Sequence, residues 1–233
     1  MEINSDFAKR AVMHGRDMDW VPSPTAGVER KMLDRIGDEV ARATSIVRYA
    51  PGSAFPAHVH GGGEEYFVLD GVFQDEGGDH PEGTYVRNPP GSRHTPASAP
   101  GCTIFVKLWQ FDPADRTPVR IDTGADSEAN VADGAADGTA GVDSRELFRD
   151  ARETVRLLRC APGAAISVQP VGGYEVFVLG GDFISGVEAF RPWSWLRLPI
   201  GSDFTAMAGP NGCRLLTKEG HLRFADAAAP GTT

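Results

Sequence analysis

Short runs of apolar residues recur along the chain, each bounded by turn-forming residues. The runs at 43–52, 64–71, 83–91 and 102–111 are rich in Val, Ile, Phe, Tyr and Leu, and Gly, Pro, Asp and Asn separate them. This length and turn chemistry are typical of β-strands. Long apolar faces of period 3.6 are missing, and only residues 144–152 favour one or two helical turns. The pattern therefore predicts an all-β chain of sandwich or barrel type.

The pattern also repeats. Four segments have a similar partner 110 or 111 residues further on, in the same order: 48–54 with 159–165, 65–73 with 175–183, 89–92 with 199–202, and 101–107 with 212–218. An ordered set of matches at a nearly constant offset indicates a duplicated domain. Between the halves, residues 122–143 are mostly Asp, Gly and Ala without an apolar period, which is typical of a linker or mobile loop. We predict a first domain with an N-terminal extension at 1–115, a linker at 116–143 and a second domain at 144–233.

Charge and composition narrow the classes of partner. Residues 112–143 hold eight acidic and two basic side chains and so supply −6 of the net charge of −9. This balance argues against nucleic-acid binding through the phosphates. No apolar run is long enough for a membrane helix, and no secretion signal is visible, so we expect a cytoplasmic protein. The three cysteines lack metal or disulfide spacing and are expected to be buried thiols.

Candidate metal ligands gather in the first half. His58 and His60 are two residues apart, so on a strand both side chains point to the same face. Three glycines follow, which permit a tight turn with positive φ, and Glu64 or Glu65 then enters the next strand. His94 comes after a Pro-Gly turn. Three imidazoles and a carboxylate suit one divalent transition metal, such as iron, zinc, manganese, nickel or copper.

The spacing of these residues resembles the two cupin motifs. The first is matched by Gly52, His58, His60, Glu64 and Gly71, and the second by Gly83, Pro89, Gly91 and His94, with Ser98 in place of a final Asn. The surrounding sequence is similar to the ChrR-like branch of cupins. The resemblance implies two tandem cupin barrels, which are double-stranded β-helices of the jelly-roll type. It also implies a metal site made of His58, His60, Glu64 and His94.

The repeat supports the choice of Glu64 over Glu65. The second half keeps Glu175 opposite Glu65 but has Tyr174 opposite Glu64. A glutamate that persists where the other ligands are lost is expected to have a structural role, so Glu64 is the predicted ligand.

The second half lacks the other ligands. Gln169 stands opposite the first histidine, Pro170 or Val171 opposite the second, and Phe204 opposite the third. We expect this half to pack against the first and to shape it, without holding a metal.

The remaining polar residues fall into two groups, candidates for a substrate pocket and residues that are expected at the surface. The candidates for a substrate pocket lie on or beside the strands of the metal site: Tyr66, Tyr85, Arg87, Arg93, Lys107 and Trp109. The remaining histidines, His14, His80 and His221, are expected at the surface. Asp75, Glu76 and Asp79 are expected at a solvated hairpin tip.

The resemblance favours a metal-binding protein with one divalent ion per chain. Iron and zinc are the first candidates for this ion. The main hypothesis is a non-haem Fe(II)-type dioxygenase that acts on a small diketone or aromatic ketone. The alternatives are a ChrR-like regulatory zinc-binding module, or an isomerase or small-ligand binder. The first hundred residues contain no cysteine for the zinc domain of an anti-sigma factor, which weighs against the regulatory role. The family also leads us to expect a homodimer that binds a small molecule.

Overall fold

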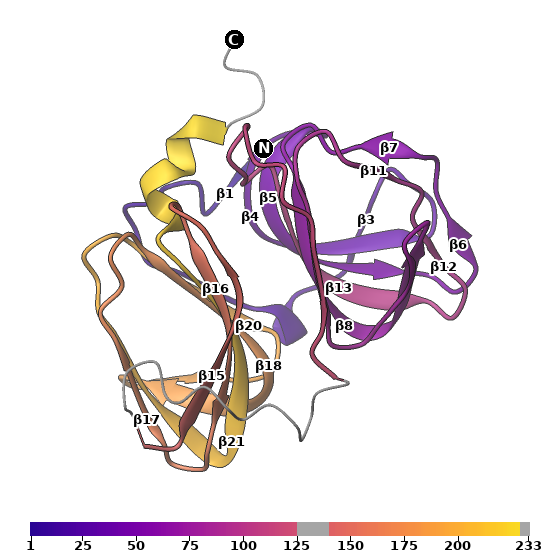
Figure 1. Cartoon of the computed structure of the whole chain (residues 1–233). Helices are drawn as coiled ribbons and strands as arrows, with labels where there is room; N and C mark the ends of the chain where they lie inside the picture. The colour runs from indigo at the N-terminus through magenta and orange to yellow at the C-terminus, as the bar shows by residue number, and fades with distance from the viewer. Residues whose placement is uncertain (125–139, 229–233) are drawn as a thin grey trace. The chain divides into compact units, whose positions relative to one another are not determined.

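The computed structural model describes residues 1–124 and 140–228, and β-strands make up most of it (Figure 1). This confirms the all-β prediction. The described residues fall into two compact units. The first unit comprises residues 1–5, 19–124 and 226–228, and the second comprises 6–18 and 140–225. Neither of the two helices in these ranges is long and apolar enough to cross a membrane.

The first unit is built on one large antiparallel sheet and a separate two-stranded one. Its strands are β1 (Glu2–Ile3), β3 (Val21–Pro22), β4 (Val28–Gly37), β5 (Ala41–Tyr49), β6 (Ser53–Ala54), β7 (His58–Val59), β8 (Glu64–Asp75), β9 (Gly78–Pro81), β10 (Thr84–Asn88), β11 (Arg93–His94), β12 (Ala97–Ser98), β13 (Cys102–Leu108) and β14 (Val119–Asp122). The main path of the large sheet runs β1-β4-β5-β13-β8-β10-β14, and β7 pairs with β11 alone.

Strand β8 has two different faces because successive side chains point to opposite sides. Tyr66 and Val68 lie in the buried apolar cluster of the first unit, together with Phe73, Ile104 and Val106. Glu64, two residues before Tyr66, therefore starts the strand on the same face as this core.

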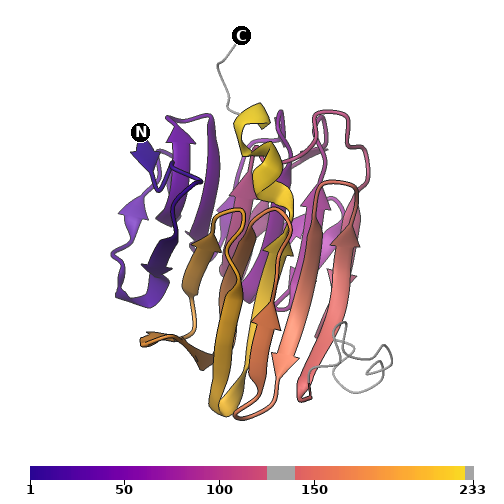
Figure 2. The ribbon, with the colours of Figure 1, turned by 90° about the vertical axis from the view of Figure 1, so that its left-hand side faces the viewer.

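The second unit repeats the arrangement of long paired strands. Its elements are β2 (Ala11–His14), η1 (Gly15–Asp17), β15 (Val142–Arg149), β16 (Thr154–Cys160), β17 (Ala165–Val168), β18 (Tyr174–Ser185), β19 (Glu188–Phe190), β20 (Ser194–Leu198) and β21 (Phe204–Glu219), and η2 (His221–Ala228) extends beyond it. The sheet order is β15-β16-β21-β18-β20-β2. Figure 2 shows its long strands, in salmon to yellow, side by side. Phe183 and Phe190 stack in its core, with ring centroids 4.6 Å apart.

The two halves share a backbone detail that supports the internal repeat. Gly71 in β8 has φ +72°, and Gly181 in β18 has φ +66°. A Cβ atom at either position would lie 2.1 Å from a backbone carbonyl oxygen, that of Gly101 just before β13 or that of Gly212 in β21. Only glycine fits such a close approach of two backbones.

Three predictions about the boundaries of elements need correction. The segment expected to form helical turns, 144–152, is mostly strand, because β15 pairs with β16 along its length. The predicted linker at 116–143 contains β14, which pairs with β10, and the start of β15. Its residues 125–139 lie outside the described part of the chain. In each case an available strand edge supplies hydrogen-bond partners, and tertiary pairing overrides local propensity.

The third correction concerns the predicted first domain at 1–115. Its N-terminal segment β2 pairs with β20 of the second unit, with Ala11 opposite Arg197 and His14 opposite Ser194. The units are therefore not continuous stretches of sequence. Pairing with β2 covers a sheet edge that would otherwise present unpaired backbone groups.

The close approach at Gly71 gives a testable prediction. Gly71→Ala should lower the free energy of unfolding by at least about 3 kcal/mol, because it adds a backbone clash to the strain of a positive φ. Gly52 has φ +77° but open space around the Cβ position, so Gly52→Ala should lose only about 1–2 kcal/mol. Urea unfolding of both variants measures the difference. Equal losses would contradict the role of the close approach.

Candidate metal centre

Pairing of two short strands brings the histidines together. In the β7–β11 pair His94 lies directly opposite His58, and their ring centroids are 5.0 Å apart. The ring of His60 lies 4.9 Å from that of His58 and 4.6 Å from that of His94. One ring nitrogen from each histidine lies within 4.8 Å of the other two. Among the described residues this is the one group of three or more side chains of suitable type that could hold a metal ion.

Glu64 borders the three histidines. Its Oε2 atom lies 3.5 Å from Nε2 of His60 and 3.6 Å from Nε2 of His94. Asn88, opposite Glu64 in the β8–β10 pair, donates a hydrogen bond of 3.1 Å from Nδ2 to the same oxygen. The structure thus brings together the four residues whose spacing resembles the cupin motifs.

The donor atoms fit a cation. Nε2 of His60 and Nε2 of His94 are buried and have no hydrogen-bond partner. Unpaired polar atoms in the interior are costly, and buried imidazoles beside a carboxylate are the donor set that divalent transition metals prefer. His58 is exposed, so one side of the group is open to solvent.

Asp75 orients His94 from behind. Its Oδ2 atom lies 3.2 Å from Nδ1 of His94, and its Oδ1 atom lies 2.9 Å from Nε2 of His80. A hydrogen bond at Nδ1 fixes the ring so that Nε2 points into the site, as carboxylates behind metal-binding histidines do. Asp75 and His80 thus form a supporting pair for the group of histidines.

These contacts correct two predictions. His80 was expected at the surface but is buried, because the β8–β9 hairpin places it opposite Phe73. Asp75 was expected at a solvated hairpin tip but contacts two histidines. The Gly77–Gly78 turn could have indicated a hairpin that returns His80 to Asp75. The approach of His94 depends on strand pairing that no local pattern specifies.

The titration of this group follows from burial and neighbouring charge. Burial lowers the pKa of His60, which keeps its imidazole neutral. Burial also disfavours the charged form of His94, but the hydrogen bond to Asp75 and the charge of Glu64 raise its pKa overall. Burial would raise the pKa of Asp75, yet the hydrogen bonds from His80 and His94 hold it well below its usual value. The side chain of Asp75 is therefore ionised and negatively charged.

The glycine turn is needed for close packing as well as for backbone conformation. Only Gly63 of the three glycines has a positive φ, +78°. A Cβ on Gly62 would lie 2.3 Å from the indole of Trp109, and one on Gly61 would lie 2.9 Å from it. Trp109, predicted as a pocket residue, thus packs against the turn between His60 and Glu64.

Three further pocket candidates lie on the opposite face of the sheet. Tyr85 donates a hydrogen bond of 2.8 Å to Oε1 of Glu65, and Nη1 of Arg87 lies 3.6 Å from Oε2 of Glu65. Lys107 donates a hydrogen bond of 3.0 Å to Oγ1 of Thr44. Glu65 follows Glu64 on the strand and so points away from the histidines. These residues form a buried polar network behind the sheet instead of lining the group of histidines.

The last two pocket candidates differ. Arg93 is exposed and lies opposite Val59 in the β7–β11 pair. Val59 stands between His58 and His60 in the sequence, so Arg93 faces away from these histidines. Tyr66 is buried beneath Glu64, with its ring centroid 4.8 Å from that of Phe73. Its hydroxyl is buried without a hydrogen-bond partner, and burial together with the charges of Glu64 and Asp75 raises its pKa. Of the six candidates, Tyr66 is the one that lies on the same face of β8 as Glu64.

Two histidines of the second unit complete the comparison with the sequence predictions. His221 was expected at the surface but is buried, with Nε2 3.1 Å from Oε1 of Glu175. The backbone of Leu222 bonds to Gly172, which holds η2 in place and explains this burial. His14 is partly buried, and its Nδ1 lies 3.0 Å from Oγ of Ser194.

This chain is similar to known proteins in part of its sequence and in its fold. Residues 8–112 match the family model of the ChrR cupin-like domain. The chain is similar to YlbA from Escherichia coli, with a TM-score of 0.67, 15% identity and coverage of 93% of both chains. It is also similar to the E. coli pirin YhhW in complex with nickel(II), with a TM-score of 0.63, 12% identity and coverage of 91% and 98%.

A third similar structure is a salicylate 1,2-dioxygenase variant from Pseudoaminobacter salicylatoxidans, with a TM-score of 0.58, 11% identity and coverage of 82% of this chain and 76% of that chain. At these identities the likeness concerns the fold. No curated protein matches the sequence. Residues 8–112, slightly less than half of the chain, are thus similar to the ChrR cupin-like domain, and the likeness to solved structures shows a cupin fold.

The opposite directions of Glu64 and Glu65 give a paired prediction. Glu64→Gln should strongly reduce the metal content of protein purified without chelator, because it removes the carboxylate that faces Nε2 of both His60 and His94. Glu65→Gln should leave the metal content unchanged but lower the free energy of unfolding by about 2 kcal/mol or more, because Arg87 loses a buried partner. Elemental analysis and urea unfolding measure the two effects. The reverse pattern would assign the ligand role to Glu65.

The contact between Asp75 and His94 gives a second prediction. Asp75→Asn should weaken metal binding about 10- to 100-fold, because the carboxylate no longer orients the imidazole. Asp79, on the same hairpin, accepts a hydrogen bond from Gln74, so Asp79→Asn is the matched control and should bind as the wild type does. Titration with cobalt(II), followed by visible absorption, gives both affinities. Equal affinities in the two variants would remove Asp75 from the site.

Proposed function

We propose that this protein is a metal-dependent cupin oxidoreductase of the dioxygenase class, acting on a small organic molecule. The observation that carries the proposal is the pair of buried, unpartnered imidazole nitrogens of His60 and His94 beside Glu64. His58 completes the ligand set, and the side of the group where it is exposed gives access from solvent.

The metal would be held by Nε2 of His60 and His94, the ring of His58 and the carboxylate of Glu64. Three imidazoles and one carboxylate accept iron, manganese, nickel, zinc or copper, and we take iron as the first candidate. When bound, a redox-active divalent ion would supply the electron-transfer chemistry that a reaction with dioxygen requires. Four protein ligands leave room for a substrate beside them, as in other oxygenase sites built on histidine and carboxylate.

The protein would supply geometry and a partly dry environment. Asp75 and Asn88 hold His94 and Glu64 in fixed orientations. The ring of Phe73 lies 5.7 Å from that of His94 and forms an apolar wall. The Tyr66 hydroxyl has no hydrogen-bond partner and would donate a hydrogen bond to a substrate oxygen.

The substrate class is proposed by analogy with the branch of cupins that the sequence resembles. Small β-diketones and aromatic ketones offer oxygen atoms that can approach a metal, and both atoms of dioxygen would enter the products. The similar salicylate 1,2-dioxygenase supports a dioxygen reaction on a small aromatic compound.

A regulatory metal-binding module is the second candidate, and the match to the ChrR cupin-like domain favours it. In this case zinc would occupy the same four ligands and would have a structural role without oxygen consumption. The two candidates differ in the metal found and in the reaction with dioxygen.

Metal analysis and oxygen uptake test the proposal together. Protein purified without chelator should contain about one iron per chain, and oxygen uptake with at least one β-diketone or aromatic ketone of a panel should exceed the rate without substrate. His58→Ala and His94→Ala should each lose the metal and the uptake. Gln169→Ala, at the corresponding position of the second unit, is the control and should keep both.

Two results would contradict the dioxygenase proposal. Iron-loaded protein that consumes no oxygen with any member of the panel removes its main support. Zinc at one equivalent, with no uptake after iron replacement, would favour the regulatory module instead. Equal metal loss in Gln169→Ala and His94→Ala would refute a single metal site in the first unit.

A further inference from the structure

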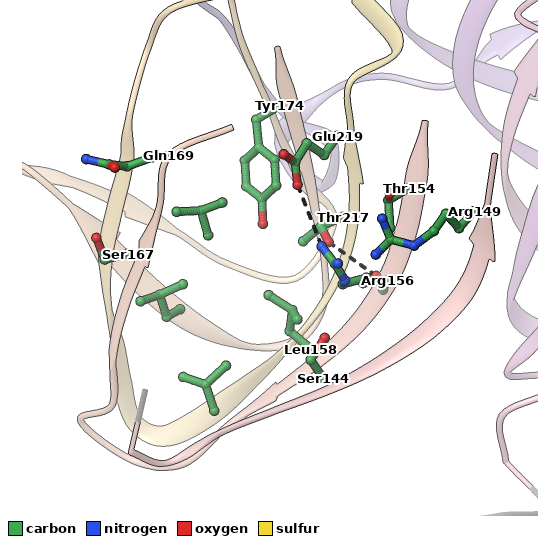
Figure 3. A pocket seen from close by; sticks show the side chains of 13 residues that line it. Ser144, Arg149, Thr154, Arg156, Leu158, Ser167, Gln169, Tyr174, Thr217 and Glu219 are labelled. Atoms are coloured by element: carbon green, nitrogen blue, oxygen red, sulfur yellow. Dashed lines mark hydrogen bonds and ion pairs between the residues drawn. The ribbon is translucent and has the colours of Figure 1, made fainter. Parts of the chain in front are cut away.

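The second unit contains a cavity of about 650 Å³ that its sequence did not lead us to expect (Figure 3). Its lining comes from β15, β16, β17, β18 and β21 and the turn that follows β17. Volumes of this size are typical of sites for small organic molecules. Two of the lining residues, Gln169 and Tyr174, stand in the repeat where the first unit has the candidate ligands His58 and Glu64, so this cavity occupies an equivalent part of the fold.

The repeat shows how the interior has changed. Tyr174 stands where the first half has Glu64, and Arg156 and Glu219 stand where it has Ser45 and Leu108. All three second-half residues line the cavity. The second half has therefore exchanged a possible metal ligand for a phenol and has gained a guanidinium and a carboxylate. Charged groups inside a barrel are costly unless they are paired or bind something.

The two charged residues are held together but remain accessible. Nη1 of Arg156 lies 3.6 Å from Oε2 of Glu219, and the side chains are 24% and 26% exposed. Glu219 is held in turn by the backbone N–H of Val171, at 3.3 Å from Oε1. A guanidinium has five N–H donors, so a single contact with Glu219 does not use its capacity to bind a second anion.

The cavity has a charged side and an apolar wall. Figure 3 shows Arg149 and Arg156 close together on one side, with Ser167 and Gln169 across from them. Arg149 forms an ion pair with Glu146 near the surface, with Nη2 2.7 Å from Oε2. The apolar lining residues are Val142, Leu158, Ile166 and Val168. Each of the two arginines has N–H donors beyond its contact with a glutamate, and such donors favour a ligand that carries a carboxylate.

We propose that this cavity binds a small organic carboxylate with an apolar body. The carboxylate would lie against the Arg156 guanidinium, which matches its planar geometry and can form two parallel hydrogen bonds. The apolar body would contact Leu158, Ile166 and the ring of Tyr174. The cavity thus offers a second, metal-independent binding site, distinct from the candidate metal centre of the first unit.

Calorimetric titration of the full chain tests this inference with benzoate, phenylacetate and hexanoate as probes. At least one carboxylate should bind, while benzamide and benzyl alcohol, which lack the charge, should bind at least about tenfold more weakly. Arg156→Gln should reduce carboxylate affinity about tenfold or more, and Arg156→Lys should recover part of the loss. Arg149→Gln, near the surface, should reduce it by a smaller factor without affecting folding.

The variant His94→Ala and chelator-treated wild type keep this test separate from the proposed function. Both should bind the carboxylate as untreated protein does, because no lining residue is a candidate metal ligand. Binding that disappears in His94→Ala but persists in Arg156→Gln would place the carboxylate at the metal and overturn the proposal. The absence of binding by all three carboxylates up to millimolar concentration would overturn it as well.

Discussion

Two buried imidazole nitrogens that lack a hydrogen-bond partner impose the main constraint on the first unit. Nε2 of His60 and Nε2 of His94 face the carboxylate of Glu64 at 3.5 and 3.6 Å, too far for good hydrogen bonds and well placed for a shared ion. The other contacts near the site keep these atoms in place. Asp75 fixes one ring, Asn88 fixes the carboxylate, and the packing of Trp109 on the glycine turn supports the segment between His60 and Glu64.

The pleat of β8 separates two kinds of chemistry within one strand. Glu64 faces the histidines and the apolar core, while Glu65 faces Tyr85 and Arg87 in a buried polar network. The two carboxylates are neighbours in sequence, but one has the surroundings of a metal ligand and the other those of a structural ion pair. This separation also explains why most of the pocket candidates on the strands do not reach the histidines.

The internal repeat keeps the backbone and changes the interior. Gly71 and Gly181 make the same close backbone approach in the two halves, which indicates that the paired long strands are the preserved element. Side chains that point inward from these strands can differ as long as the volume and the apolar pattern of the core are kept. One interior gathers imidazoles and a carboxylate, and the other gathers an arginine, a glutamate and a tyrosine around a cavity.

The sequence by itself determined the all-β class, the internal repeat and the residues that meet near Glu64, because short apolar runs, constant offsets and motif spacing are local or periodic signals. The tertiary structure decided what depends on pairing between distant strands. It brought Asp75 and His80 behind His94, buried His221 against Glu175, added β2 to the second unit and formed β15 where helical turns were expected. Burial and contact at these positions arise from segments far apart in the chain, and no local pattern specifies which edges meet.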